Sequence, residues 1–348
     1  MRKPHLSPRR PRRIGTGART LPAAILAVAA LVLGVVPADA AHTAPPPGTD
    51  LRPATLPAGD GPRVPWLVGG DTIADGQVRV RLPGSGKILL GASGDAYVAG
   101  LTARDGTARL LRVTPDGTRR RLGDGIDPYA SVLSADGTRV VETRWDRRER
   151  TRVRVFDATS GALLAQRRFD RPGRVLDARA DRVLLGFSDP GRTLWWDPGT
   201  GRITRVATQA GYHASIRADR LATFTRDPYD GGCTVVRRLS APRTVLWRSC
   251  DDAVAAFSPT GRRVATVPIL TDGLGARSLL VRTVRGGEIL AGYRVGGWFG
   301  AIGWESARTL LLDAHGTRRT ATVRCAPTRC ERASRAVPTT APRAVAER

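Results

Sequence analysis

Short apolar runs alternate with turns from Trp66 to about Ser334. One stretch shows the unit clearly: an apolar run ending at Phe257 meets Ser-Pro-Thr-Gly at 258–261, and a second apolar run follows. Proline presets the backbone φ angle of such a turn, and glycine supplies the left-handed conformation that a later position needs. The pattern therefore predicts two antiparallel strands joined by a tight turn.

Related turns recur in two interleaved series. The first series consists of Asp75-Gly76, Asp116-Gly117, Ser160-Gly161, Thr200-Gly201, Ala241-Pro242, Gly286-Gly287 and Pro327-Thr328. The second consists of Gly94-Asp95, Asp136-Gly137, Ala180-Asp181, Ala218-Asp219, Thr260-Gly261 and Glu305-Ser306. Successive turns of one series lie about 38 to 45 residues apart, and the two series are offset by about half a period. Two turns per period predict four strands per repeat.

A four-stranded sheet repeated in this way closes best as a β-propeller, because radial closure hides the sheet edges. We therefore predict an all-β fold, a β-propeller domain over residues 66–334, with seven blades of four antiparallel strands. Six blades with an N-terminal extension is the alternative. Six blades are assigned to residues 83–125, 126–170, 171–207, 208–250, 251–294 and 295–334. An earlier hairpin at 72–82 gives a partial seventh blade, whose missing strand we expect from the other end of the chain.

Three segments carry a resemblance to known propeller families. Residues 153–164 (Val-Arg-Val-Phe-Asp-Ala-Thr-Ser-Gly-Ala-Leu-Leu) resemble the segment from third to fourth strand in WD-repeat propellers. Residues 194–201 are similar and keep the Trp-Asp pair, whereas residues 257–265 resemble the repeat of TolB-type propellers. The Gly-His pair that opens many WD repeats is absent from the sequence. The resemblance implies a rigid platform for partners and does not imply catalysis.

The N-terminus reads as an export signal. Residues 1–20 are basic, residues 21–36 form an uncharged apolar run, and Ala-Asp-Ala at 38–40 matches a small-x-small cleavage site. We predict a signal peptide over 1–40, cleavage before Ala41, and a secreted or cell-envelope protein. An uncleaved membrane anchor is the alternative, although the run is shorter than the ~20 residues of a spanning helix. A Pro-rich linker is predicted over 41–65 and a disordered tail over 335–348.

The chain is strongly basic, with a formal net charge of +25, of which residues 1–40 contribute +6. Only Lys3 and Lys87 are lysines, so nearly all the basic residues are arginines. The arginines are dispersed, which favours a role in solubility together with codon bias. The alternative is non-specific attraction to anionic polymers, with a strong dependence on salt.

Four cysteines in an exported chain allow three pairings. Folding the chain about Ala241-Pro242 places Cys233 opposite Cys250, and folding about Pro327-Thr328 places Cys325 opposite Cys330. Directly opposed strand residues lie within disulfide range. We therefore predict the disulfides Cys233–Cys250 and Cys325–Cys330, each inside one blade.

The sequence offers few carriers of catalytic chemistry. After residue 40 the only histidines are His42, His213 and His315. The Gly-x-Ser-x-Gly sequence of hydrolases does not occur, and residues 84–88 lack parts of a phosphate-binding loop. The spacing of Cys and His does not fit zinc. We expect no catalytic residues, no metal and no cofactor.

Loop placement indicates where a ligand would bind. In a propeller, the loops from second to third strand and the links between blades share one face, where ligands usually sit. Candidate residues on this face are Asp124, Asp127, Tyr129, Asp170, Arg171, Tyr212, His213, Tyr229, Asp251, Asp252, Trp298 and His315. Several carboxylates around one channel would hold a cation or a basic peptide. The competing interpretation is that each Asp makes a turn by bonding its own backbone.

These features predict an exported, monomeric, disulfide-stapled binding scaffold rather than an enzyme. The predicted partner is a protein, a peptide or an anionic envelope polymer, with no specific nucleic acid and no membrane after signal cleavage. The alternative is a propeller-type lyase or glycosidase that uses the channel acids with His213. Acids within hydrogen-bonding reach of His213 would favour the enzyme, and dispersed acids would favour the scaffold.

Overall fold

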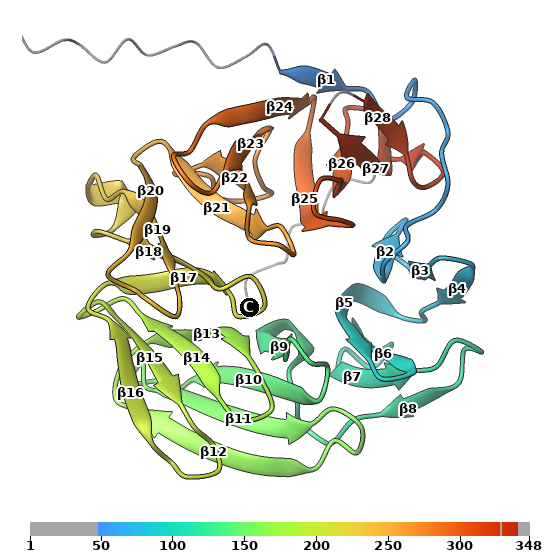
Figure 1. The fold of residues 1–348 in the computed structure, drawn as a ribbon. Helices are drawn as coiled ribbons and strands as arrows, with labels where there is room; N and C mark the ends of the chain where they lie inside the picture. The colour runs from blue at the N-terminus through green and yellow to red at the C-terminus, as the bar shows by residue number, and fades with distance from the viewer. Residues whose placement is uncertain (1–47, 328, 340–348) are drawn as a thin grey trace, which may run out of the picture. The chain divides into compact units, whose positions relative to one another are not determined.

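The computed structural model describes residues 48–327 and 329–339, in which seven β-sheets are arranged around a ring (Figure 1). The predicted signal peptide, its cleavage site and most of the predicted tail lie outside the described residues. The seven-bladed, all-β propeller predicted from the turns is confirmed. Within the described ranges, no helix has the length and apolar character needed to cross a membrane.

Six sheets have four consecutive antiparallel strands each, and their limits match the predicted blades. The first three contain β5 (Ser85–Ser93), β6 (Ala96–Thr102), β7 (Ala108–Val113) and β8 (Arg119–Arg121); β9 (Ser131–Leu133), β10 (Arg139–Trp145), β11 (Thr151–Asp157) and β12 (Leu163–Phe169); and β13 (Gly173–Ala178), β14 (Val183–Phe187), β15 (Arg192–Trp196) and β16 (Ile203–Ala207). The next three contain β17 (Ala210–Ser215), β18 (Arg220–Phe224), β19 (Thr234–Arg238) and β20 (Val245–Ser249); β21 (Asp252–Phe257), β22 (Arg263–Pro268), β23 (Ser278–Thr283) and β24 (Ile289–Val295); and β25 (Trp298–Trp304), β26 (Leu310–His315), β27 (Arg319–Ala326) and β28 (Arg329–Arg332).

The seventh blade has three strands, β2 (Trp66–Val68), β3 (Thr72–Asp75) and β4 (Val78–Arg81). Because β4 leads into β5 as β8 leads into β9, these strands correspond to the second, third and fourth of a blade. Figure 1 accordingly draws β2 farther from the centre of the ring than β5 and β25. The prediction that a strand from the chain's other end completes this blade is wrong for the described residues. The last described strand, β29 (Val337–Pro338), pairs with β27 of the sixth blade instead.

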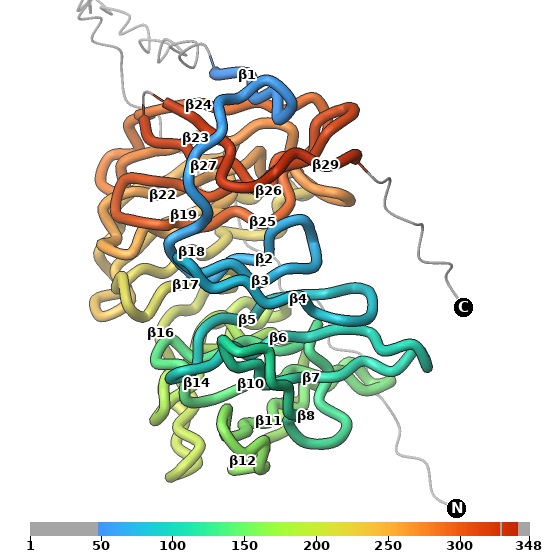
Figure 2. Tube along the Cα trace, turned by 90° about the vertical axis from the view of Figure 1, so that its right-hand side faces the viewer, coloured from blue at the N-terminus to red at the C-terminus, as the bar shows by residue number. Residues whose placement is uncertain are grey.

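The ring closes through a strap, which we define as residues 48–65. This strap is the described part of the predicted linker, and Figure 2 follows it from β1 (Thr49–Leu51) to β2. Strand β1 pairs in parallel with β24, and the side chain of Leu51 is buried in the core there. A parallel bridge between Ala58 and Arg332 fixes the middle of the strap.

Buried Arg324 fastens the end of the strap to the sixth blade. Its Nε and Nη2 atoms donate to the two carboxylate oxygens of Glu305 at 2.6 and 2.7 Å. Its Nη1 and Nη2 atoms also donate to the carbonyl oxygens of Asp60 at 2.9 Å and Gly61 at 2.7 Å. Beyond the strap, Trp66 Nε1 on β2 donates to Asp313 Oδ1 at 2.9 Å. Side-chain hydrogen bonds thus join the two ends of the ring.

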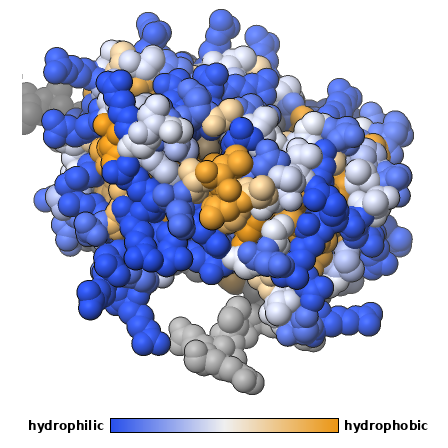
Figure 3. All heavy atoms as spheres, turned by 90° about the horizontal axis from the view of Figure 1, so that it is seen from below, coloured by the Kyte–Doolittle hydropathy of each residue, from blue (hydrophilic) through white to orange (hydrophobic). Residues whose placement is uncertain are grey.

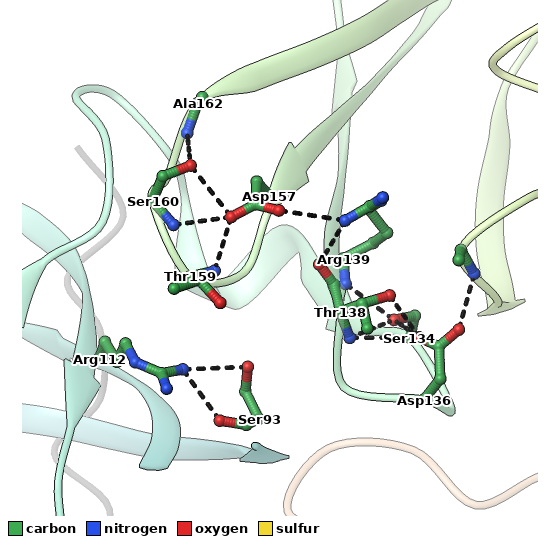
Figure 4. Close-up of polar contacts among 11 residues, drawn as sticks. Ser93, Arg112, Ser134, Asp136, Thr138, Arg139, Asp157, Thr159, Ser160 and Ala162 are labelled. Carbon is green, nitrogen blue, oxygen red and sulfur yellow. Dashed lines mark hydrogen bonds and ion pairs between the residues drawn. The ribbon is translucent and has the colours of Figure 1, made fainter. Parts of the chain in front are cut away.

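The turns between first and second strands repeat the same hydrogen bonds. In the stretch 258–263, Gly261 N–H donates to Ser258 O at 2.8 Å, and Arg263 N–H donates to Ser258 Oγ at 3.0 Å. In the second blade, Gly137 N–H donates to Ser134 O at 2.8 Å, and Arg139 N–H donates to Ser134 Oγ at 2.9 Å (Figure 4). The two turns are copies of one unit, as the sequence predicts.

These turns also fit tightly against the neighbouring blade. A Cβ atom on Gly137 would lie 2.6 Å from Ala92 O, and one on Gly261 would lie 2.5 Å from Ala218 O. Both glycines have positive φ angles, 70° and 64°. In the other direction, Asp136 Oδ2 accepts a hydrogen bond from Ala180 N–H of the third blade at 2.9 Å. Each turn therefore links one blade to the next.

The turns between third and fourth strands depend on aspartate. Asp157 Oδ1 accepts from the N–H groups of Thr159 at 3.0 Å and Ser160 at 2.7 Å (Figure 4). Asp197 Oδ1 accepts in the same way from Gly199 at 2.9 Å and Thr200 at 3.0 Å. These aspartates stabilise their turns by accepting hydrogen bonds from nearby backbone N–H groups.

Both predicted disulfides are present. Cys233 and Cys250 extend the pairing of β19 with β20, with Cα atoms 4.0 Å apart. Cys325 pairs directly with Cys330 across β27 and β28, with Cα atoms 4.2 Å apart. Both bridges lie inside single blades, so they staple hairpins and not the ring closure.

The Gly261→Ala substitution tests the fit between blades. The control is Gly106→Ala, because Gly106 has φ 79° and nothing within 4 Å of an added Cβ. Both variants lose ~1 kcal/mol from the left-handed backbone. Gly261→Ala loses about 1–3 kcal/mol more, because its methyl group meets a fixed carbonyl. Guanidinium unfolding measures the free energy of unfolding of each variant. Equal losses in the two variants would contradict a close fit between blades at Gly261.

Candidate binding face

Two neighbouring hollows lie on the face formed by the loops from second to third strand and the links between blades. The Tyr212 hollow, about 670 Å³, is lined by Trp145, Arg174, Phe187, Asp189, Tyr212, Phe224, Arg226 and Asp227, among others. The Tyr129 hollow, about 760 Å³, is lined by Asp127, Tyr129, Ser131, Thr143, Arg144, Trp145 and Arg174, among others. They share Trp145 and Arg174, so together they form one extended depression over the second, third and fourth blades.

Trp145 stands between the hollows at the end of β10. Its side chain is 63% exposed, although its Nε1 atom donates to Gly173 O at 2.9 Å. One edge of the indole is therefore fixed to the neighbouring blade and the rest is open. An exposed, positioned tryptophan is a preferred anchor for a partner.

Glu142 supports this region from beneath, because its side chain is fully buried. Its Oε1 atom accepts from Arg144 Nε at 2.9 Å and from Asp127 N–H at 2.7 Å. Its Oε2 atom accepts from Arg154 Nε at 2.5 Å. Charge-assisted bonds from three groups compensate its burial and hold the loop at Asp127 in place.

Two Asp-Pro-Tyr turns present tyrosines on this face. They form the 3₁₀ helices η1 (Pro128–Ala130) and η2 (Pro228–Asp230). Asp127 Oδ1 accepts from Tyr129 N–H at 3.0 Å, and Asp227 Oδ1 accepts from Tyr229 N–H at 2.9 Å. The exposed fractions are 48% for Tyr129 and 69% for Tyr229. Each aspartate is a cap, and each tyrosine is held toward solvent.

Tyr212 forms the aromatic wall of its hollow. Its ring stacks on Phe224 with centroids 3.8 Å apart and an interplanar angle of 8°. Its hydroxyl lies 2.9 Å from Thr234 Oγ1 and accepts from Val254 N–H at 2.8 Å. Burial raises the pKa of Tyr212. The side chain is consequently a fixed, neutral surface.

Other predicted face residues lie apart from the two hollows. Asp124 pairs with Arg121 at 3.2 Å, whereas Asp251 is exposed on the fifth blade. Asp252 is buried and accepts from Ser249, Thr266 and Arg282. Trp298 and His315 stack on each other in the sixth blade, with centroids 4.6 Å apart. Asp170 and Arg171 line a separate hollow at the outer wall.

The predicted channel acids do not cluster around His213. Its ring lies 5.5 Å from that of Phe257, centroid to centroid, and desolvation lowers the pKa of His213 to about 4. Among the described residues no hydrogen bond reaches its side chain. Burial also lowers the pKa of His315, whose Nδ1 lies 3.2 Å from Thr320 Oγ1. Asp124 and Asp252 bond to other groups, and among the described residues neither they nor Asp251 forms an ion pair or hydrogen bond with His213.

Sequence reasoning missed Trp145, Arg174, Phe224 and Arg226. Only the fold brings these residues together, because they come from three blades. One signal was available: Asp-Pro-Tyr occurs at 127–129 and again at 227–229. The cis peptide bond Asp189–Pro190, which lines the Tyr212 hollow, has no comparable signal.

Comparison with known proteins supports the fold alone. No family model matches the chain, and no curated protein matches it. A chain in the crystal structure of the mitotic checkpoint complex is similar over 83% of this chain and 86% of its own, with 13% identity and a TM-score of 0.52. TolB from Acinetobacter baumannii is similar over 64% of this chain and 61% of its own, with 16% identity and a TM-score of 0.42. The β-propeller domain of the Trilobed protease from Pyrococcus furiosus covers 72% and 82%, with 11% identity and a TM-score of 0.44.

Asp313, at the junction of the sixth and seventh blades, predicts a pH dependence of stability. Burial raises the pKa of Asp313 to about 6, against the opposing effect of hydrogen bonds from Trp66 and Thr322. The folded state therefore holds this proton at a higher pH than the unfolded chain does. Between about pH 4 and 6 the free energy of unfolding falls as pH rises, on the order of 2 kcal/mol from this group.

The Asp313→Asn variant should lose the contribution of Asp313 to the pH dependence of stability, whereas the contributions of other titratable groups remain. Guanidinium unfolding of both proteins between about pH 4 and 7 measures the difference in their free energies of unfolding. As pH rises, the stability of the variant should increase relative to that of the wild type. Asp251→Asn, at an exposed site, is the control and should follow the wild type. Parallel curves for wild type and Asp313→Asn would rule the assignment out.

Proposed function

We propose that this protein is an exported binding scaffold whose loop face holds an extended peptide segment of a protein partner. The observation that carries the proposal is the exposed Trp145 between two hollows, with an Asp-Pro-Tyr turn beside each. An apolar or aromatic partner side chain enters each hollow, and the intervening segment crosses Trp145. The dispersed acids and the desolvated His213 support binding in preference to catalysis.

The physical basis for binding is preorganisation. Trp145, Tyr129 and Tyr212 are each held by a hydrogen bond to a neighbouring strand or loop. Little side-chain entropy is lost when such groups receive a partner. Arg144 and Arg174 lie in the same depression as Asp127 and offer groups of both signs to a peptide backbone and its polar side chains.

The two disulfides indicate an oxidising compartment, extracellular or in the envelope. Export through a signal peptide over 1–40 accounts for this environment. The monomeric state is part of the same proposal.

Intact mass of the secreted protein tests export. We expect a chain that begins at Ala41 and is four hydrogens lighter than the reduced form, because both disulfides close after translocation. A mass that includes residues 1–40 in a membrane fraction would instead support the anchor. Four free thiols in the secreted protein would contradict the oxidising location.

Selection from a random peptide library tests the binding face. Peptides selected on the wild-type protein should lose about 10- to 30-fold in affinity for Trp145→Ala, because loss of a central aromatic anchor costs ~2 kcal/mol. Calorimetry or fluorescence anisotropy gives the affinities. Val245→Ala, which removes an exposed apolar side chain outside both the face and the other hollows, should leave them unchanged. Equal losses in both variants, or none in Trp145→Ala, would overturn the proposed face.

A further inference from the structure

A third hollow lies at the outer wall, between the second and third blades. This arginine hollow has a volume of about 540 Å³ and is lined by Arg167, Arg168, Phe169, Asp170, Arg171, Phe187, Arg192, Leu194, Ile203 and Arg205. Strands β12 and β16, the outermost of their blades, bound it (Figure 1). Only Phe187 also lines the Tyr212 hollow, so this is a separate site.

The floor of the arginine hollow is apolar. Phe169 and Phe187 pack with ring centroids 5.3 Å apart, and Leu194 is buried beside them in the same core cluster. The strand register then fixes the charges above this floor. Arg192 is paired with Phe187, and Arg205 is paired with Leu194.

Figure 3 views the molecule from the side of β12 and shows an apolar patch surrounded by hydrophilic atoms. Strand β12 itself carries two exposed leucines, Leu163 and Leu164, before its arginines. The outer wall of the second blade thus combines exposed apolar and strongly basic surface.

Five arginines line the hollow, against the single carboxylate of Asp170. Among the described residues none of the five makes an ion pair, whereas Arg154, Arg282 and Arg324 elsewhere are all bound to buried carboxylates. The Nη1 atom of Arg171 is shielded from solvent and has no hydrogen-bond acceptor in the described protein. A buried donor without an acceptor is costly; Arg182, Arg263 and Arg282 have such an atom as well, but only Arg171 lines this hollow, where an external oxygen would supply the acceptor.

Arg167 shows how the cluster is held without a counter-charge. Its Nη1 atom donates to Gly201 O at 2.6 Å, and its guanidinium lies 5.7 Å from the centroid of the Phe169 ring. Arginine stacked on an aromatic ring is positioned for bidentate recognition of phosphate or carboxylate. The mutual repulsion of five like charges is relieved when an anion binds.

We propose that the arginine hollow binds a linear polyanion with repeating phosphate or carboxylate groups. A single small anion reaches only one or two of the guanidinium groups, because they are spread over β12, β15, β16 and the link at 170–171. A polymer satisfies them together, and its less polar backbone lies on the Phe169–Leu194 floor. The site is independent of the peptide-binding face and remains if that proposal fails.

Calorimetric titration with three probes tests the proposal: long-chain inorganic polyphosphate, polygalacturonate and orthophosphate. The wild-type protein should bind a polymer with an affinity that falls steeply between about 50 and 200 mM salt, and orthophosphate at least 10-fold more weakly. Preferential binding of polyphosphate or of polygalacturonate distinguishes a phosphate from a carboxylate ligand. Orthophosphate binding as strong as polymer binding would overturn the proposal.

Arg192→Gln/Arg205→Gln is the informative variant, and Arg104→Gln/Arg308→Gln is its charge-matched control. Arg104 and Arg308 are exposed loop residues whose side chains make no hydrogen bond or ion pair with described residues. We expect a loss of about 10-fold or more for the hollow variant, with a salt slope smaller by about 1.5, and less than about 2-fold for the control.

Equal losses in the two double variants would show diffuse charge attraction and overturn the site. Thermal unfolding checks that each variant folds, and the exposed single substitution Arg205→Gln replaces the double variant if that one does not. Trp145→Ala should leave polymer binding unchanged, which separates this result from the outcome for the peptide face.

Discussion

The contact that the rest of the structure depends on is the close fit between neighbouring blades, seen where the turns at Gly137 and Gly261 pack against the preceding blade. A four-stranded sheet of this size cannot bury both of its faces alone, and it is stable only between two others. The glycines at 137 and 261 let a backbone carbonyl of the preceding blade approach more closely than any side chain allows. Asp136 adds a hydrogen bond in the opposite direction, and hydrogen bonds from Ser134 and Thr138 lower the pKa of its carboxylate to about 2, although burial opposes the shift. The repeat length in the sequence therefore corresponds to the number of residues between one such turn and the next.

A ring built in this way must join its first blade to its last, and here a network of side chains performs that task. The seventh blade consists of β2 to β4. The strap, which precedes it in the sequence, runs along the fifth and sixth blades and bonds to both. Arg324 links the strap to Glu305, and Trp66 links β2 to Asp313. The two disulfides lie elsewhere, within the fourth and sixth blades, so covalent bonds do not secure the junction.

The sequence predicted the features that depend on local pattern. The blade limits, the seven-blade count and the pairing of Cys233 with Cys250 all follow from turns and strand register over fewer than about 45 residues. The closing strand was predicted wrongly because the strap's partners lie more than two hundred residues away, and nothing local marks Arg324 as the donor to the strap's carbonyl groups. The hollow around Trp145 and the arginine hollow were likewise not predicted, because their lining residues come from different blades and meet only in the folded protein. Arg192 and Arg205 look dispersed along the chain and meet only when β15 and β16 pair.

The strap has a consequence for how the chain assembles. Its residues Asp60 and Gly61 are hydrogen-bonded to Arg324 across sequence separations of 264 and 263 residues. Contacts of such high contact order form late and slowly, because the loop between them must be organised first. The earliest part of the domain to emerge during synthesis thus waits for the latest part before it finds its place. Until then the seventh blade lacks its contacts with the sixth, and the unfinished ring exposes surface that is prone to aggregation.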